Sequence, residues 1–485
     1  MKKNIIYSFI AFLLLFGTAC EEFLEEYPST SLPADQAIQN VTDLQNAVNG
    51  VYTQLIQPDL PSYSTFYAGD YIAYGDLRAG DMTFILNSNQ ISPVARYGYD
   101  KNSRYADAFW KMPYVSLARI NDILSVVDKL DVEEGEEAVY NDLIGQLHAM
   151  RGLLHFDLAR VFCQIPTALH NGMTMTTENG GIPIADQKFP VDYQPARSTL
   201  EDTYHFIVQE FNEAIGLLNP EPARAESYGF FNIYSAKAIK AKALLYLGDY
   251  DEAVSIAGET IEEMGNAGYR LATIDEYPTM WSETAQPEFL LEFITNLNYN
   301  GQRNSIGYYA DPEGYGEFGL TESFVSFMES NPDDVRNQAY ELKVSDDGQG
   351  EGYYPSKYPG RLGSLYVNNP RIIRVAEVYL IAAEAAFLND EPALAASYIN
   401  ELRRERISGY TDVASVTLED ILDERRRELF AEGERSFDAW RNKKSVLNTD
   451  FGTEPVNYDN YRTIMAIPQR ETDISATLVQ NDGWE

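Results

Sequence analysis

AKALLYLGDYDEAVSI, at residues 241–256, decides the fold class. An alanine-rich helix, a short turn at Gly248-Asp249 and a second helix are expected, because small side chains allow close helix packing and glycine ends helices. A similar segment, AEVYLIAAEAAFLNDEPALAASYI, fills residues 376–399 and has its turn at Asn389-Asp390. Such helix pairs are typical of tetratricopeptide (TPR)-type repeats. Since the two segments lie far apart, the sequence predicts a few helical hairpins separated by long insertions, not a tandem array.

Helical periodicity extends over most of the chain. Apolar residues recur at spacings of three and four from Asp43 to Leu55, from Ile120 to Leu130 and from Leu143 to Phe162. The best strand signal is EFLLEFI at 288–294. We therefore predict a mainly α fold, in which TPR-like helical hairpins form a scaffold with long irregular loop insertions.

Three insertions interrupt the helical pattern, at about residues 58–102, 163–195 and 269–369. Gly, Pro, Asn and Tyr are frequent in the first and the third. Both are too long for passive connections, and long loops on a helical scaffold usually carry the function. We therefore expect the ligand site on these loops.

The composition limits the partners. With 45% hydrophobic residues among 485, the chain is globular rather than disordered. Its 37 basic and 74 acidic residues give a net charge of −37, which repels phosphate backbones and acidic polysaccharides. No nucleic-acid partner is expected, and a neutral glycan or a cationic peptide fits this charge best.

The first residues have the pattern of an export signal. Lys2 and Lys3 precede an apolar run at 5–16, and small residues lead into Cys20. The run is shorter than the approximately 20 residues that a transmembrane helix needs. We predict a lipoprotein signal peptide at residues 1–19.

Cys20 stands where a bacterial lipobox has its acylated cysteine, although Gly17 replaces the usual aliphatic residue. Lipidation of Cys20 with palmitate-type acyl chains is the favoured interpretation, and a plain signal peptide is the alternative. The acidic residues 20–33 then form a lipidated tether. Cys163, the other cysteine, is expected to be a buried, inert thiol.

Catalytic signatures are lacking: we find no P-loop, GxSxG or HExxH motif, and four histidines make a histidine-rich metal site improbable. The segments 311–317 and 345–351 are acidic and glycine-rich and offer oxygen ligands to Ca²⁺, but neither has EF-hand spacing. We interpret them as solvated loops and predict no cofactor, no metal and no catalytic residue.

The densest charge cluster is residues 421–441. Its acids and arginines at helical spacing, with a helix break near Gly433, indicate either a basic binding face or a structural ion-pair lattice, and we favour the lattice. Arg374, Glu377 and Glu384 are expected on one helix, where they would hold neighbouring helices.

A set of segments in a defined order resembles the SusD/RagB family of outer-membrane nutrient-binding lipoproteins of the Bacteroidetes. The segments are CEEFLEEYP from Cys20, WKMPYVSLARIND from Trp110, RGLLHFDLARVFCQIP from Arg151, MWSETAQPEFLLEF from Met280, RIIRVAEVYLIAAEA from Arg371, INELRRER from Ile399, ERRRELFAEGERSFDAWR from Glu424 and IPQRE from Ile467.

The resemblance implies a single SusD-like domain over residues 34–485, on the outer face of the outer membrane. It implies that the protein binds an oligosaccharide, or a peptide, and delivers it to a SusC-like TonB-dependent transporter, without being an enzyme. Glycan-binding members use aromatic platforms in the loops. The candidate ligand-binding residues here are Tyr97, Tyr99, Asn102, Trp281, Arg303, Tyr308, Tyr309 and Tyr315.

Two alternatives belong to other classes. A secreted all-helical glycoside hydrolase would need paired carboxylates in a cleft, and a helical-repeat scaffold that binds only proteins would not need the loop aromatics.

Overall fold

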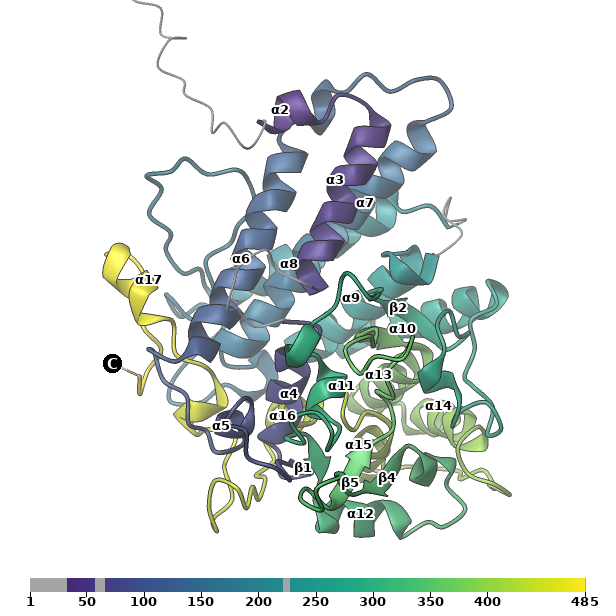
Figure 1. Cartoon of the computed structure of the whole chain (residues 1–485). Coiled ribbons are helices and arrows are strands. Elements are labelled where there is room, and N and C mark those ends of the chain that lie inside the picture. Colours follow the sequence, from purple (N-terminus) through teal and green to yellow (C-terminus); the bar gives the residue numbers. More distant parts are fainter. Residues whose placement is uncertain (1–32, 57–65, 221–226, 485) are drawn as a thin grey trace, which may run out of the picture.

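The computed structural model describes residues 33–56, 66–220 and 227–484. Most of the regular structure is helical, as predicted, and the strands are short and few (Figure 1). Among the described helices, none combines the length and the apolar composition that a bilayer-crossing segment needs. Cys20 and the predicted signal peptide and tether lie outside the described residues, apart from Pro33.

The α-helices are α2 (Ala34–Ala37), α3 (Val41–Ile56), α4 (Asp70–Leu77), α5 (Ser92–Ala95), α6 (Arg104–Leu124), α7 (Glu137–Phe162), α8 (Leu200–Leu217), α9 (Ile233–Leu247), α10 (Tyr250–Asn266), α11 (Ile306–Tyr309), α12 (Glu322–Glu329), α13 (Val375–Leu388), α14 (Pro392–Arg404), α15 (Leu418–Glu428), α16 (Arg435–Arg441) and α17 (Gln469–Ile474). The strands are β1 (Met82–Thr83), β2 (Phe289–Glu292), β3 (Gly319–Leu320), β4 (Tyr340–Lys343), β5 (Gly352–Pro355) and β6 (Arg371–Arg374).

The two predicted helical hairpins are α9/α10 and α13/α14. Gly248 ends α9 with a left-handed φ of 89°, a conformation that glycine adopts without strain. The side chain of Asp249 then caps α10 by accepting a hydrogen bond from the backbone N–H of Glu252. Buried alanines let α13 pack against both α14 and α10, so the two hairpins are adjacent in space although far apart in sequence.

The central helix α7 packs against α8, α6 and α3. Figure 1 shows these four helices side by side above the region that contains α4, α11 and the small strands. Cys163 follows α7 and is buried, and burial raises the pKa of its thiol to about 11. The expected burial of Cys163 is confirmed, and a raised thiol pKa agrees with the expectation of low reactivity.

The first and third insertions meet in one antiparallel sheet with the order β1-β3-β5-β4. Its register pairs Met82 of β1 with Leu320 of β3, and Leu342 of β4 with Tyr353 of β5. The predicted strand signal at 288–294 contains β2, which pairs with β6. Strand pairing therefore joins loops that are more than 200 residues apart and places them at one end of the helical scaffold.

The second insertion lies against other helices. The hydroxyl of Tyr114 in α6 donates a hydrogen bond to the carbonyl of Pro183 at 2.8 Å, and the amide of Asn121 donates to the carbonyl of Ala185 at 2.9 Å. This loop is thus fixed to α6 rather than to the sheet.

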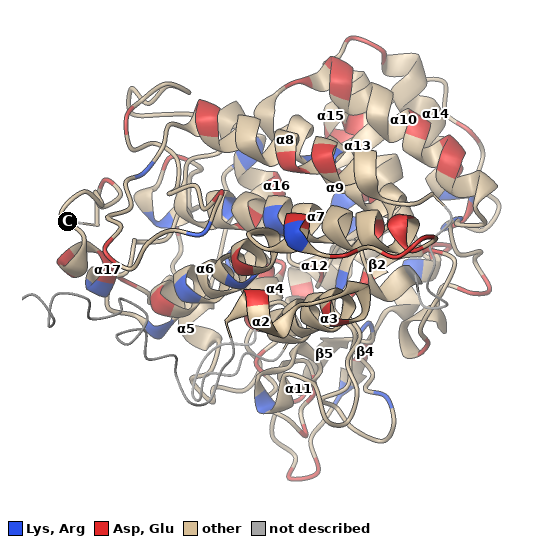
Figure 2. Cartoon of the chain, turned by 90° about the horizontal axis from the view of Figure 1, so that it is seen from above, with Lys and Arg blue, Asp and Glu red and all other residues tan. Residues whose placement is uncertain are grey.

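The charge cluster 421–441 is a buried ion-pair lattice, as favoured from the sequence. It forms α15 and α16, and the chain turns between them at Gly433, where φ is 86°. Arg374 pairs with Glu428 of α15, Glu377 pairs with Lys242 of α9, and Glu384 pairs with Arg441 of α16. Arg374 is the last residue of β6, directly before α13, so the expectation that all three residues lie on one helix is wrong for Arg374. Glu377 and Glu384 do lie on α13, and all three residues form ion pairs with neighbouring helices, as expected. Much of the remaining acidic charge lies outside, and Figure 2 shows Asp and Glu on outer helices that include α8, α14 and α17.

Candidate ligand-binding site

Three of the predicted ligand-binding residues gather on the surface around α11: Arg303, Tyr308 and Tyr315. The ring of Tyr308 meets that of Tyr315 edge-on, with centroids 4.9 Å apart, and that of Tyr366 at 5.2 Å. All three rings are partly buried, and Arg303 is exposed beside Tyr366. We call Arg303, Tyr308, Tyr315 and Tyr366 the tyrosine cluster.

Two close backbone approaches hold the cluster together. A Cβ on Gly314 would lie 2.1 Å from the carbonyl oxygen of Tyr308, so only glycine lets the loop close back onto α11. A Cβ on Gly307 would lie 2.1 Å from Nδ2 of Asn368 and so would push α11 away from the segment that carries Tyr366. The backbone N–H of Tyr315 also donates to the carbonyl of Tyr308 at 2.8 Å.

Tyr309 packs against the tyrosine cluster from the protein interior. Its ring is fully buried and lies nearly parallel to that of Tyr315, with centroids 6.0 Å apart. Its hydroxyl donates a 2.8 Å hydrogen bond to the carboxylate of Asp70 in α4. Burial, and after it the nearby Asp70 charge, raise the pKa of Tyr309, so the hydroxyl stays protonated and donating. Tyr309 therefore positions the site and offers no ring face to a ligand.

Three further candidates point into the interior. Tyr97, Tyr99 and Trp281 are each 3% exposed or less. The hydroxyl of Tyr97 donates to the carbonyl of Arg78, and that of Tyr99 donates to the carbonyl of Arg462, both at 2.8 Å. Buried rings offer no face to a ligand, and the hydroxyls of the buried tyrosines are already hydrogen-bonded within the protein. The expectation of sugar platforms at Tyr97, Tyr99 and Trp281, and at Tyr309, therefore needs correction.

Asn102 is exposed but is not brought to the cluster by any contact that the structure gives. Its backbone N–H donates a 2.8 Å hydrogen bond to the carboxylate of Asp100, a local contact that is typical of a turn residue.

Sequence reasoning missed Tyr366. It lies in RLGSLYVNNP at 361–370, a glycine- and asparagine-containing stretch of the same insertion as Tyr308. A local signal for Tyr366 exists, because it is a tyrosine in a loop of the same kind as the loop around Tyr308. Nothing local indicated that it approaches α11, since that approach depends on the close contact at Gly307.

The acidic segments considered for Ca²⁺ have other partners. Asp311 forms an ion pair with Lys343 at 3.1 Å, and Glu317 accepts backbone N–H groups of Gln90, Ile91 and Ser92 at the start of α5. Among the described residues, no group of three or more His, Cys, Asp or Glu side chains is placed to hold a metal ion. These carboxylates stabilise the loops beside the cluster.

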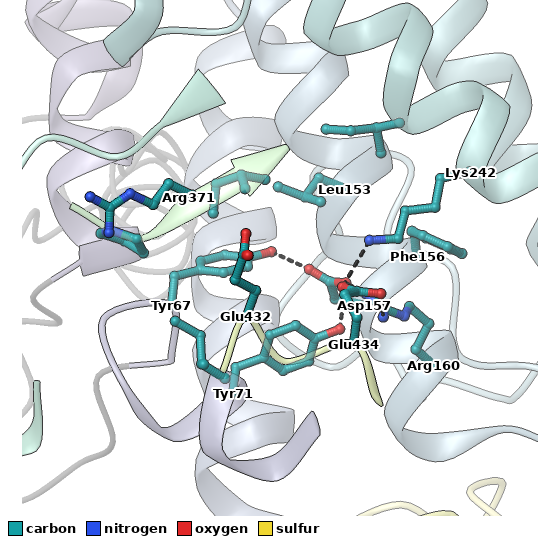
Figure 3. Close-up of a pocket in the computed structure, with 14 residues that line it drawn as sticks. Tyr67, Tyr71, Leu153, Phe156, Asp157, Arg160, Lys242, Arg371, Glu432 and Glu434 are labelled. Carbon is teal, nitrogen blue, oxygen red and sulfur yellow. Dashed lines mark hydrogen bonds and ion pairs between the residues drawn. The ribbon is translucent and has the colours of Figure 1, made fainter. Parts of the chain in front are cut away.

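A small pocket of about 40 Å³ lies between α4, α7 and α9 (Figure 3). The hydroxyls of Tyr67 and Tyr71 each donate a 2.6 Å hydrogen bond to Asp157. Arg160 lies 3.3 Å from Asp157 and 2.6 Å from Glu434.

The pKa values of Asp157 and Glu434, two of the carboxylates that line this cavity, shift in opposite directions. Burial raises the pKa of Asp157, although Arg160 opposes it. Burial acts in the same direction on Glu434, but Arg160 and Lys242 hold its pKa below the usual range. A cavity of this size holds one or two water molecules, whereas ligand pockets measure about 300–1,000 Å³. It is an internal polar site rather than a cleft for a sugar.

A larger open hollow of about 470 Å³ lies between α10, α13 and α14. Its two arginines are already neutralised, because Arg270 pairs with Glu276 and Arg404 pairs with Asp412. Aromatic residues contribute only Tyr269 and Tyr379, so this hollow has less of the stacking surface that the tyrosine cluster offers.

Two family models match the chain. The model described as the SusD family matches residues 295–484, and the model described as "Starch-binding associating with outer membrane" matches residues 22–245. The chain belongs to the SusD/RagB family. The first match includes the whole tyrosine cluster, and the second includes α4, which supports Tyr309.

Relatives within the SusD/RagB family extend over nearly the whole chain. SusD-like protein P2 of Formosa agariphila is 25% identical and aligns with 99% of both chains. A crystal structure of a putative sugar-binding protein from Bacteroides vulgatus has a TM-score of 0.81 and 29% identity, covering 93% of this chain and 100% of its own. A laminarin-binding SusD-like protein shares the fold, with a TM-score of 0.72 at 20% identity over 92% of this chain and 100% of its own. The predicted SusD-like α fold is confirmed.

Proposed function

We propose that the protein is a cell-surface binding lipoprotein that captures an oligosaccharide and delivers it to a SusC-like TonB-dependent transporter, with a peptide nutrient as the alternative cargo. The tyrosine cluster is the observation that carries this proposal. Sugar rings present C–H faces and hydroxyl edges, so neighbouring tyrosines supply faces for stacking and Arg303 supplies hydrogen-bond donors.

Similar proteins support the choice of a saccharide. The relatives include one described as sugar-binding and one described as laminarin-binding. The description of the second matching family names association with the outer membrane, which agrees with a lipid-anchored surface protein. The transporter partner follows from the family resemblance alone.

Binding without turnover distinguishes this function from the alternatives. Native affinity electrophoresis in gels that contain single polysaccharides is expected to retard the protein in at least one gel, and incubation with the same polysaccharide is expected to release no shorter product. Product formation would indicate the all-helical glycoside hydrolase. An absence of retardation by every polysaccharide, with retention by a protein partner, would indicate the protein-only scaffold.

The hydrolase alternative receives little support from the carboxylate pair Asp157 and Glu434. Arg160 bridges the pair, and the cavity beside it is much smaller than a sugar ring with its reacting water would need. A glycosidase needs two carboxylates facing an open cleft.

Changing Cys20 to alanine is expected to abolish membrane anchoring and to leave the fold unchanged. Acyl chains contribute about 0.8 kcal/mol for each buried CH₂ group, so several chains are needed for stable attachment. The measurement is fractionation of cells that lack the transporter partner, with circular dichroism of the purified variant as the control for folding. A C20A variant that still sediments with outer membranes would contradict lipid anchoring through this residue.

A further inference from the structure

Arg303 differs from most cations of this chain in having no carboxylate partner within ion-pair distance among the described residues. Its neighbours are the phenols Tyr366, Tyr308 and Tyr315. Phenols are uncharged near neutral pH. The guanidinium charge is therefore left uncompensated at the surface, in a chain with 74 acidic residues and only 37 basic ones.

Arg303 lies in a tight, exposed turn before α11. Gln302 adopts a left-handed φ of 47° directly before it, and the backbone N–H of Ser305 closes the turn by donating to the carbonyl of Gln302 at 3.1 Å. In the acidic segment 311–317, Asp311 already pairs with Lys343, which also pairs with Glu341. The cluster thus combines three ring faces with one solvent-exposed cation.

Resting on the proposed function, we propose that the saccharide taken by the tyrosine cluster is anionic, with a carboxylate or sulfate substituent that pairs with Arg303. A guanidinium matches both of these oxyanions with two parallel N–H donors, and charge-assisted hydrogen bonds are about twice as strong as those to neutral hydroxyls. Arg303 lies directly before α11, which carries Tyr308, so one sugar can stack on the rings and pair its substituent with the guanidinium.

The net charge of −37 favours a neutral ligand when the protein is viewed as a whole. At physiological ionic strength, however, charges more than about 8 Å apart are largely screened. Contact with Arg303 is local, so it outweighs distant carboxylates on the outer helices.

Matched pairs of polymers test this inference. The probes are polygalacturonate with its methyl ester, and a sulfated galactan with its desulfated form, so each pair differs only in charge. Dissociation constants come from affinity electrophoresis or calorimetry. The wild-type protein is expected to bind one anionic member at least about tenfold more tightly than its neutral counterpart, and the preferred pair distinguishes carboxylate from sulfate.

Three variants complete the test. R303Q is expected to remove the preference of about tenfold for the anionic polymer. R303K is expected to keep only part of that preference, because lysine lacks the two parallel donors. R404Q, which removes an equal charge from α14, is expected to bind as the wild type does. Equal binding of charged and neutral members, binding of neutral members only, or an unchanged preference in R303Q would overturn the inference. Binding of neutral polymers that is lost in Y308A would leave the proposed function standing. If the wild-type protein binds none of the polymers, neutral or anionic, both the inference and the proposed function are overturned.

Discussion

Changing Glu428 to glutamine is expected to lower the free energy of unfolding by about 3–5 kcal/mol, because it removes the central anion of a buried lattice. The Glu428 carboxylate is fully buried and contacts Arg336, Arg374 and Arg406 at 3.0, 2.7 and 3.0 Å. Burial opposes its ionisation, but these arginines hold the pKa of Glu428 well below its usual range. Arginine does not lose its proton in proteins, so the variant cannot remove the excess charge that remains.

The matched control is Glu419 to glutamine, the same change on the same helix α15. Glu419 pairs with Lys444, and both side chains are largely exposed, 63% and 44%. Exposed pairs contribute about 0–1 kcal/mol, so E419Q should unfold close to the wild type. Urea unfolding followed by far-ultraviolet circular dichroism measures both variants. Equal stability of E428Q and E419Q would show that the lattice adds little to stability.

Local sequence signals were sufficient for the helical scaffold. The hairpin α9/α10 depends on residues that are adjacent in the chain, such as Gly248 in its left-handed conformation and the cap at Asp249. The apolar periodicity of α7 likewise predicts the face that it buries. For these elements the interactions that decide the structure lie within a few residues of one another.

The sequence predicted that an ion-pair lattice exists, but it did not predict which residues pair with one another. Charge spacing in 421–441 predicted neutralisation within that segment. The partners of Glu428 instead come from positions 22, 54 and 92 residues away in the chain. Only the packing of α15 against β6, the segment after α14 and the segment before β4 brings them together.

At the candidate site, too, the sequence did not predict which loop tyrosines are buried and which are exposed. Tyr97 and Tyr99 lie in a loop of the same composition as the one around Tyr308, and tyrosine suits both an interior and a surface position. Their burial is due to the far end of the chain, where Phe451 lies 4.8 Å from Tyr97 and Trp484 lies 6.2 Å from Tyr99, centroid to centroid. The sequence around Tyr97 and Tyr99 gives no signal that these distant aromatic residues pack against them.

Changing Tyr308 or Tyr366 to alanine is expected to weaken saccharide binding by about 1–3 kcal/mol each, the usual cost of losing a ring that anchors a ligand. This corresponds to roughly 5- to 150-fold in the dissociation constant. Both rings are partly buried, so the midpoint of thermal unfolding should change little. Tyr309 is unsuitable for the same test, because its removal would open a cavity in the core and lower stability as well as binding.

Tyr193 provides the matched control, since it is a 43% exposed tyrosine in the second insertion, where it stacks on Phe189 with centroids 4.0 Å apart. Calorimetry with a polysaccharide that retards the wild-type protein should give weaker binding for Y308A and Y366A and unchanged binding for Y193A. Because Tyr308 contacts Tyr366 directly, the double variant should lose less than the sum of the two single losses. Wild-type affinity in Y308A and Y366A, together with a loss in Y193A, would remove the tyrosine cluster from the site and place the saccharide on the second insertion instead.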